Sequence, residues 1–142
     1  MSYGGRMMRR VSPLGVFGCI ASQSRFALRA ADLEALGGEI ALAERTVIGS
    51  YLRNCPVIIA LMGYSEDVLG DEFLVTGGTA ILSDGVFFWR RDAAEYVETY
   101  GTGLPEDFLL RGRKEGWQVP ILSRDELIDI DDYFMWLRTQ ER

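Results

Sequence analysis

The stretch that decides the fold is TAILSDGVFFWRRDAAEYVETYGTGLPEDFLL, residues 79–110. Two apolar runs, Thr79–Ser83 and Val86–Trp89, flank an Asp-Gly pair at 84–85. Two-residue type I′ turns prefer this pair, because both central positions then need a positive φ. The sequence therefore predicts a β-hairpin across both runs, residues 79–89.

Two helices are predicted directly after the hairpin. Asp92 and Glu95 have the spacing of a capping box, and Gly101 supplies a C-terminal stop. Between them, apolar side chains recur at helical spacing and give one apolar face. Pro105 suits the first turn of the second helix, and the acids that follow it at 106–107 would lie at the positive end of the helix dipole. The unit is well specified and contains no evident reaction chemistry.

The segment before the hairpin predicts a helix and a buried strand. Residues 40–55 keep helical apolar spacing, and Pro56 forbids continuation of the helix. Val57–Met62 is an unbroken apolar run, which is typical of a central strand buried on both faces. An acidic loop, Gly63–Glu72, then leads to a short strand at Phe73–Thr76.

The N-terminal third is less clearly patterned. We expect residues 1–12 to be flexible and Leu14–Ala21 to form a core strand. The alternative is a processed targeting segment, because Arg9 and Arg10 precede this short apolar stretch. A helix from Ser24 to Leu36 is favoured next, and the alternative there is a strand over 25–30.

The C-terminal part predicts a turn at Gly116 and Trp117, a short extended piece over 119–122 and a long last helix. Ser123 and Glu126 have capping-box spacing, and the helix should run to about Arg138. Its apolar stripe follows the helical repeat and consists of Leu127, Ile130, Phe134 and Leu137.

Length and composition indicate one globular domain. The 142 residues suffice for one core and are too few for two ordinary domains. We therefore expect a single α/β (α+β) domain over 1–142, with a small mixed sheet that has Val57–Met62 at its centre and the hairpin 79–89 beside it, flanked by helices. No apolar run approaches the roughly 18–20 residues of a membrane-spanning helix.

The absence of histidine excludes several kinds of site. Catalysis by Ser-His-Asp or Cys-His, zinc binding through histidine and histidine-based pH sensing all require that side chain. Cys19 and Cys55 are too few for a four-cysteine zinc site. We interpret them as two buried thiols in a reducing cytoplasm, with a disulfide as the alternative. No metal, cofactor or catalytic residue is predicted, and the protein is not expected to be an enzyme.

Charge is unevenly distributed along the chain. Residues 1–62 carry seven arginines and four acids, whereas residues 63–142 carry eight cations and seventeen acids, a net charge of −9 in the second part. An acidic C-terminal half argues against binding to nucleic acid or to an anionic membrane, and it is compatible with a cationic protein partner.

Two acidic groups are the candidate partner-binding residues. The first lies on the predicted loop, and the second opens the last helix; together they are Glu66, Asp67, Asp71, Glu72, Asp125, Glu126, Asp129, Asp131 and Asp132. The second group lacks the glycine and the final glutamate of a calcium loop. Plain solvated surface is the main alternative for both groups, and carboxylate catalysis is the lesser one.

One further group could grip a ligand. Trp89, Arg90 and Arg91 follow one another at the end of the predicted hairpin. Such a cluster can stack on a ligand or bind an anion. The favoured interpretation is core packing for the tryptophan and solvent exposure for both arginines.

The order of motifs over about residues 45–110 resembles a family of small bacterial proteins. These motifs are LSDGVFFW at 82–89, YVETYG at 96–101 and LPEDF at 104–108. Proteins with a Thr/Ser-Asp-Gly-aromatic hairpin, a Tyr-Val-x-x-Tyr helix and a Leu-Pro-x-x-Phe segment often belong with the immunity proteins of polymorphic toxin systems. Ser83 stands where threonine is commoner in these proteins, and Arg90 stands where proline often follows the tryptophan. The resemblance implies a protein that binds and blocks a cognate toxin domain.

Three functions follow from these observations. The leading hypothesis is a cytoplasmic immunity protein that neutralises a toxin through an acidic face. The second is a small enzyme or ligand-binding domain that uses carboxylates and arginine. The third is an adaptor in secretion or regulation.

Overall fold

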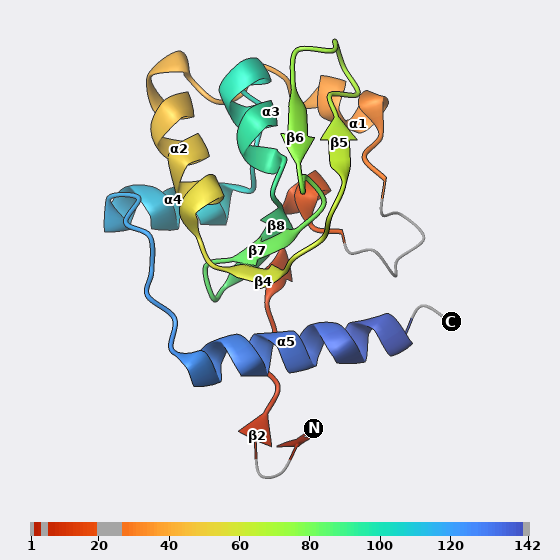
Figure 1. Ribbon diagram of the computed structural model, residues 1–142. Helices are drawn as coiled ribbons and strands as arrows, with labels where there is room; N and C mark the ends of the chain where they lie inside the picture. Colours follow the sequence, from red (N-terminus) through yellow and green to blue (C-terminus); the bar gives the residue numbers. More distant parts are fainter. Residues whose placement is uncertain (1, 4–5, 20–26, 141–142) are drawn as a thin grey trace.

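The computed structural model describes residues 2–3, 6–19 and 27–140. They form a small single-domain α+β fold, in which a mixed four-stranded sheet lies between α2 and α3 on one side and α5 on the other (Figure 1). The strands are β1 (Ser2–Tyr3), β2 (Arg6–Met7), β3 (Ser12–Pro13), β4 (Val57–Ile59), β5 (Tyr64–Glu66), β6 (Leu74–Thr76), β7 (Ile81–Ser83) and β8 (Phe87–Arg90). The helices are α1 (Ala30–Ala35), α2 (Leu42–Asn54), α3 (Ala93–Tyr100), α4 (Glu106–Glu115) and α5 (Arg124–Thr139), with a short 3₁₀ turn at Gly15–Phe17.

The predicted hairpin is confirmed and forms the centre of the four-stranded sheet, whose order is β3-β8-β7-β4. β7 and β8 pair antiparallel with Leu82 opposite Trp89. The turn lies one residue later than predicted: the Asp84 N–H donates to the Phe87 carbonyl at 3.3 Å, so Gly85 and Val86 are the central pair. Only Gly85 of this pair has a positive φ (+92°), which rules out a type I′ turn.

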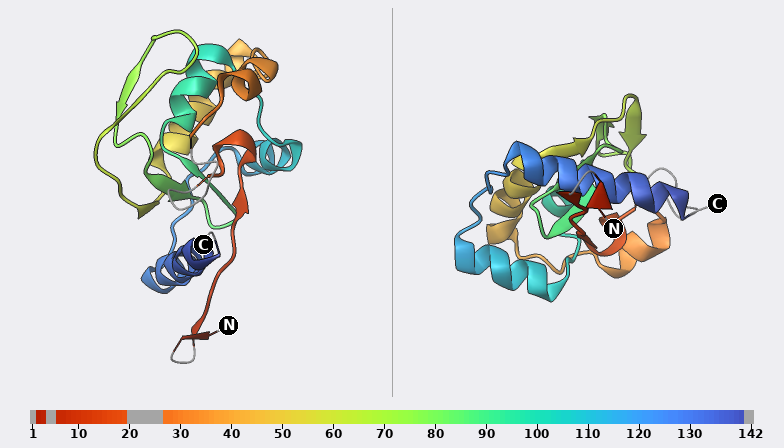
Figure 2. Two further views of the ribbon diagram at one scale, coloured as in Figure 1. Left: turned by 90° about the vertical axis from the view of Figure 1, so that its right-hand side faces the viewer. Right: turned by 90° about the horizontal axis from the view of Figure 1, so that it is seen from below.

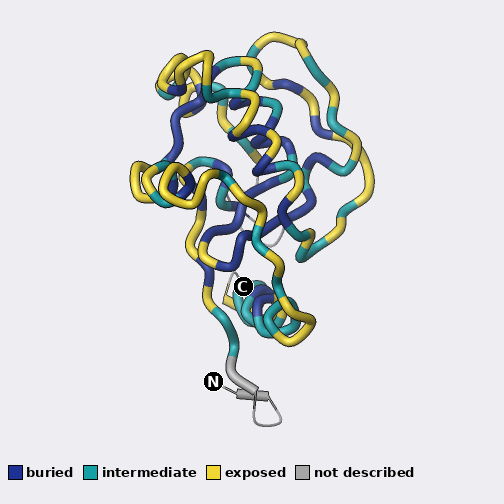
Figure 3. The backbone as a smooth tube through the Cα atoms, turned by 90° about the vertical axis from the view of Figure 1, so that its left-hand side faces the viewer, coloured by how far each residue is buried: buried dark blue, intermediate teal, exposed yellow. Residues whose placement is uncertain are grey.

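The hairpin separates two apolar cores. On one side Leu82 and Trp89 pack with residues of α2, α3 and α4. On the other side Ile81 and Phe88 pack with α5. Both strands are buried along their whole length. Figure 3 shows that buried backbone, in dark blue, is concentrated in the middle of the molecule. A sheet covered on both faces requires apolar side chains at successive positions, as the run Phe87–Trp89 provides.

The prediction for Val57–Met62 is therefore wrong in part. The strand spans only Val57–Ile59, lies at the edge of the sheet beside β7, and is half-exposed, with Val57 at 42%. Met62 is 99% exposed. The central position belongs to the hairpin, because β8 also pairs with the N-terminal strand β3, in parallel. An unbroken apolar run does not distinguish a central strand from an edge strand that one helix covers.

The N-terminal predictions also change. Leu14 is buried, but it precedes a 3₁₀ turn, so the described part of Leu14–Ala21 contains no strand. The predicted helix from Ser24 begins at Ala30, and residues 20–26 lie outside the described residues. Within the segment 1–12, Val11 is buried and Ser12 pairs with Phe87 of β8.

Apart from the start of α1, helix ends follow the predictions with one exception. α2 and α5 occupy the predicted ranges, Gly101 ends α3 with a φ of +63°, and the Ser123–Glu126 capping box is present. Asp92, however, makes no capping hydrogen bond to α3. Its carboxylate is instead buried against Arg90, since both side chains lie inside the fold.

Candidate functional site

A two-stranded ribbon projects from the body of the fold, and it includes part of the segment that was predicted to be a loop. Among the residues that the structure describes, β5 and β6 pair only with each other, antiparallel, with Tyr64 opposite Thr76 and Glu66 opposite Leu74. Opposite residues in such a pair point to the same side, and neighbours along a strand point to opposite sides. The ribbon therefore has one face made of these four side chains, which we call the ribbon face. Figure 2 shows the ribbon standing out from the helices behind it.

The two faces of the ribbon differ in burial. On the ribbon face, Tyr64 is 70% exposed and Leu74 is 58% exposed. On the inner face, Ser65 is buried and packs closely on Gly78, where any side chain would collide with its hydroxyl. The ribbon is thus fixed from behind, while its outer side chains contact solvent.

The turn that joins β5 to β6 is held by one carboxylate, that of Asp67. Its Oδ1 accepts from the Leu69 N–H at 2.8 Å, and its Oδ2 accepts from the Glu72 N–H at 2.9 Å and from the Tyr100 hydroxyl. The residue is only 4% exposed. The prediction that Asp67 lies on a partner-binding surface is therefore wrong: this carboxylate is used inside the protein.

The pKa values of Asp67 and Tyr100 are shifted in opposite directions. Burial raises the pKa of the Asp67 carboxyl, but the hydrogen bonds from Tyr100 and from the turn amides outweigh burial, so the pKa lies below its ordinary value. The hydrogen bond to Asp67 raises the pKa of Tyr100 to about 12. The carboxylate is thus ionised and the phenol protonated at neutral pH, which is the arrangement that the hydrogen bond requires.

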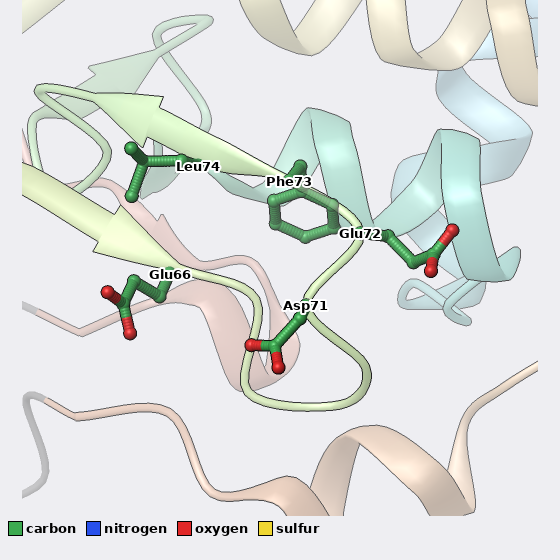
Figure 4. Close-up of a pocket in the computed structure, with 5 residues that line it drawn as sticks. All are labelled: Glu66, Asp71, Glu72, Phe73 and Leu74. Atoms are coloured by element: carbon green, nitrogen blue, oxygen red, sulfur yellow. The ribbon is translucent and has the colours of Figure 1, made fainter.

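The other three acids of this group are exposed around the turn. Glu66, Asp71 and Glu72 line a shallow hollow of about 350 Å³ together with Phe73 and Leu74. Figure 4 shows the carboxylates of Glu66 and Asp71 on the lower side of the ribbon in that view, with Glu72 pointing away from them. The structure therefore displays three separate negative charges around the turn of the ribbon.

Exposed apolar side chains accompany these acids. Besides Tyr64 and Leu74, Val68 is 44% exposed and Met62, two residues before the ribbon, is almost fully exposed. Sequence reasoning missed these side chains. No local signal identified them, because residues 64–68 (YSEDV) and 73–76 (FLVT) do not alternate between polar and apolar.

The second acidic group lies on α5, away from the ribbon. Asp125 and Asp131 are exposed, and Asp129 and Asp132 are half-buried. The ribbon turn and α5 lie at opposite sides of the four-stranded sheet in Figure 1 and in the left-hand view of Figure 2. The structure therefore does not bring the two predicted groups together into one surface.

Glu126, the fifth acid of that group, has an internal role. Its side chain accepts from the Ser123 N–H at 2.9 Å in the capping box, and it also pairs with Arg9. The Ser123 backbone and Arg9 hold the pKa of this carboxyl below its ordinary value. Glu126 thus stabilises the start of α5 and joins it to the N-terminal segment.

A second hollow, of about 410 Å³, lies beside β5 over a buried ion pair. Arg90 donates to Asp92 through Nε at 3.1 Å and Nη2 at 2.7 Å, and both side chains are almost fully buried. Burial raises the pKa of Asp92, although Arg90 opposes this. The expectation that Arg90 faces solvent is wrong, whereas core packing of Trp89 is confirmed.

The hairpin turn contains another buried carboxylate, Asp84. It accepts from the Tyr51 hydroxyl at 2.9 Å and from the N–H groups of Val86 and Phe87 at 2.9 and 2.8 Å. Arg111 lies 3.7 Å away. These partners explain why an acid is tolerated there, and they fix the turn to α2 and α4.

Both cysteines are confirmed as buried thiols that are not joined by a disulfide. Within the described residues, no group of three or more acids and cysteines is arranged to hold a metal ion. In the same part of the chain, no helix has both the length and the apolar character needed to cross a membrane. In comparisons with known proteins, the chain matches no family model, no curated protein and no solved structure.

Proposed function

We propose that this protein binds another protein through the ribbon face and the acids around its turn. The observation that carries the proposal is the exposure of Tyr64 and Leu74, at 70% and 58%, on a ribbon fixed from behind. Tyrosine is enriched in the centres of protein interfaces, and charged residues are enriched at their rims. An exposed apolar pair beside three carboxylates has this composition.

The charge of the surface indicates the chemistry of the partner. Glu66, Asp71 and Glu72 are all exposed, and residues 63–142 carry a net charge of −9. Complementary charge across an interface speeds association and discriminates against wrong partners. A partner with an apolar centre and a cationic rim fits this surface best.

Toxin neutralisation is the form of binding that we propose. The motifs of the hairpin, of α3 and of the start of α4 resemble those of immunity proteins, which act by binding a toxin domain. The protein would then act in the cytoplasm of the cell that makes the toxin. In this role the ribbon would cover a cationic surface of the toxin domain.

The experiment starts from the neighbouring gene. We expect it to encode a toxin domain, whose binding to this protein would be measured with both proteins purified. The double variant Tyr64→Ser/Leu74→Ser should weaken binding at least 10-fold, about 1.4 kcal/mol. The matched control is Leu42→Ser on α2, a position that is 79% exposed, and it should bind like the unmodified protein.

Two results would overturn this proposal. Equal affinity of the double variant and the control would remove the ribbon face from the interface. The absence of any toxin domain encoded beside this gene would remove the immunity role.

The hollow over the Arg90–Asp92 pair favours a second candidate, a ligand-binding domain. Perturbed, buried ionisable groups next to a cavity are frequent at ligand sites. An NMR titration with small carboxylic acids would support this candidate if shifts gathered on Tyr64, Thr79 and Arg90, which line the hollow. No shift at millimolar concentration would argue against it.

A further inference from the structure

We propose that the contact between Asp67 and Tyr100 is a latch that presets the acidic turn of the ribbon for a cationic partner. This inference rests on the proposed function, since the turn is the acidic part of the proposed surface. Neither latch residue is expected to touch the partner. Both are positioning residues, which act through Glu66, Asp71 and Glu72.

The latch joins the turn to α3 at several points. Tyr100 is the last residue of α3, and Tyr96 lies one turn earlier on the same side of the helix. The Tyr96 hydroxyl donates to the Glu66 carbonyl at 3.3 Å and accepts from the Val68 N–H at 3.1 Å. The two tyrosines therefore hold both the start and the middle of the turn.

Aromatic packing supports the same arrangement. Phe73, at the other end of the turn, contacts both tyrosine rings, with centroids 4.8 Å from Tyr96 and 6.4 Å from Tyr100. The Phe73–Tyr96 pair is edge-to-face, a geometry that contributes beyond the area that it buries, and the Phe73–Tyr100 pair is tilted. The Tyr-Val-Glu-Thr-Tyr motif of α3 is thus the platform on which the ribbon turn rests.

The backbone of the turn is shaped to fit this platform. A methyl group at Gly70 would lie 3.0 Å from the Tyr100 hydroxyl, so the chain passes too close for a side chain to be added freely. The next residue, Asp71, has a φ of +55°, which is uncommon for a residue other than glycine. Such a backbone persists only where surrounding contacts hold it, and the latch supplies them.

The consequence for binding concerns conformational entropy. A turn that is ordered before binding loses little freedom when the partner arrives, whereas a loose turn must be ordered at the expense of affinity. The exposed acids of the turn keep fixed positions only while Asp67 accepts its three hydrogen bonds. Affinity for a cationic partner should therefore depend on Tyr100, although its hydroxyl is bonded to Asp67 and not to the partner.

The test uses Tyr100→Phe, which removes only the hydroxyl. Its matched control is Tyr133→Phe, which removes a hydroxyl from a half-buried tyrosine on α5. Hydrogen exchange of the Leu69 and Glu72 amides, both bonded to Asp67, should be at least 10-fold faster in Tyr100→Phe and unchanged in the control. Unchanged exchange in Tyr100→Phe would overturn the latch.

The second arm measures binding with a defined probe, a nona-arginine peptide, by NMR titration at low salt. Shifts of the Glu66, Asp71 and Glu72 amides should report a 3- to 10-fold weaker affinity in Tyr100→Phe and no change in Tyr133→Phe. Faster exchange without weaker binding would refute the positioning role. Neither arm uses a toxin domain, so a failure of the immunity role would remain distinguishable from a failure of the latch.

Discussion

The ribbon turn and the start of α5 have similar acidic sequences but use their acids differently. In the turn, one carboxylate is buried and satisfies two backbone N–H groups and a tyrosine hydroxyl, while three others surround exposed apolar side chains. On α5, the helix satisfies its own backbone, and only Glu126 enters the capping box. The comparison teaches that an acid becomes structural where irregular backbone needs an acceptor. Substitutions in the two regions should therefore have different effects.

Replacing Asp67 by alanine should show the contrast most strongly. It leaves the Leu69 and Glu72 N–H groups and the Tyr100 hydroxyl without their acceptor, which should lower the free energy of unfolding by about 2–3 kcal/mol. The matched change on α5, Asp131→Ala, removes an exposed carboxylate and should change it by less than about 0.5 kcal/mol. Urea denaturation of both variants measures the difference. Equal losses would mean that burial of Asp67 has no energetic consequence.

On α5 the cap should matter more than the acids. Ser123 accepts from the Glu126 N–H at 3.1 Å, and Ser123→Ala should cost about 1 kcal/mol. Neutralising an exposed acid of the same helix, by Asp125→Asn, should lower the free energy of unfolding by less. Thermal unfolding of the two variants compares them directly. A greater loss of stability in Asp125→Asn than in Ser123→Ala would mean that charge, and not the cap, stabilises the start of α5.

Acid titration should sharpen the same contrast. The folded-state pKa of Asp67 is lowered, so its stabilisation is present above the unfolded-state value near pH 4 and is lost as pH falls toward the folded value. The variant Asp67→Asn should therefore lose less stability than the unmodified protein as pH falls below about 4. Parallel curves for the variant and the unmodified protein would contradict a lowered pKa at Asp67.

Charge on α5 should affect stability least. The triple variant Asp129→Asn/Asp131→Asn/Asp132→Asn should unfold within about 0.5 kcal/mol of the unmodified protein, because charges at the surface, exposed or half-buried as these are, contribute little. It should also slow association with the toxin domain less than Glu66→Gln/Asp71→Asn/Glu72→Gln does, most visibly at low salt. Rates from stopped-flow mixing decide between them. A larger decrease in association rate for the α5 triple variant would mean that the interface lies on α5 and not on the ribbon turn.

Much of the fold could be predicted from local signals. Signals from residues close together in sequence were enough to predict the hairpin, the positions of α2 and α5, the stop at Gly101 and the Ser123 cap. The strand order could not be predicted, because β3 and β8 are joined by residues 12 and 87, which lie far apart in sequence. This long-range pairing makes the hairpin central and leaves Val57–Ile59 at the edge.

The candidate site was predictable only in part. The acids at 66, 71 and 72 lie on an exposed turn as their sequence indicates, but nothing nearby in the sequence identifies Tyr100 as the donor to Asp67. The same holds for Arg90, whose burial depends on the fold around Asp92. A contact between side chains far apart in sequence leaves no periodic pattern, so sequence reasoning placed Asp67 at a partner surface. It placed Arg90 in solvent although its partner Asp92 is only two residues away, because nothing local shows that both are buried.

The separation of the two faces of the ribbon has a consequence for how such a protein changes over generations. Tyr64 and Leu74 contact solvent, whereas Ser65 and Asp67 hold the ribbon in place from behind. If the ribbon face binds a partner as proposed, substitutions on it should alter which partner is recognised at little cost to folding. A lineage that must follow a diverging partner needs positions of this kind. The alternating pattern of a strand supplies them two residues apart, next to positions that must stay fixed.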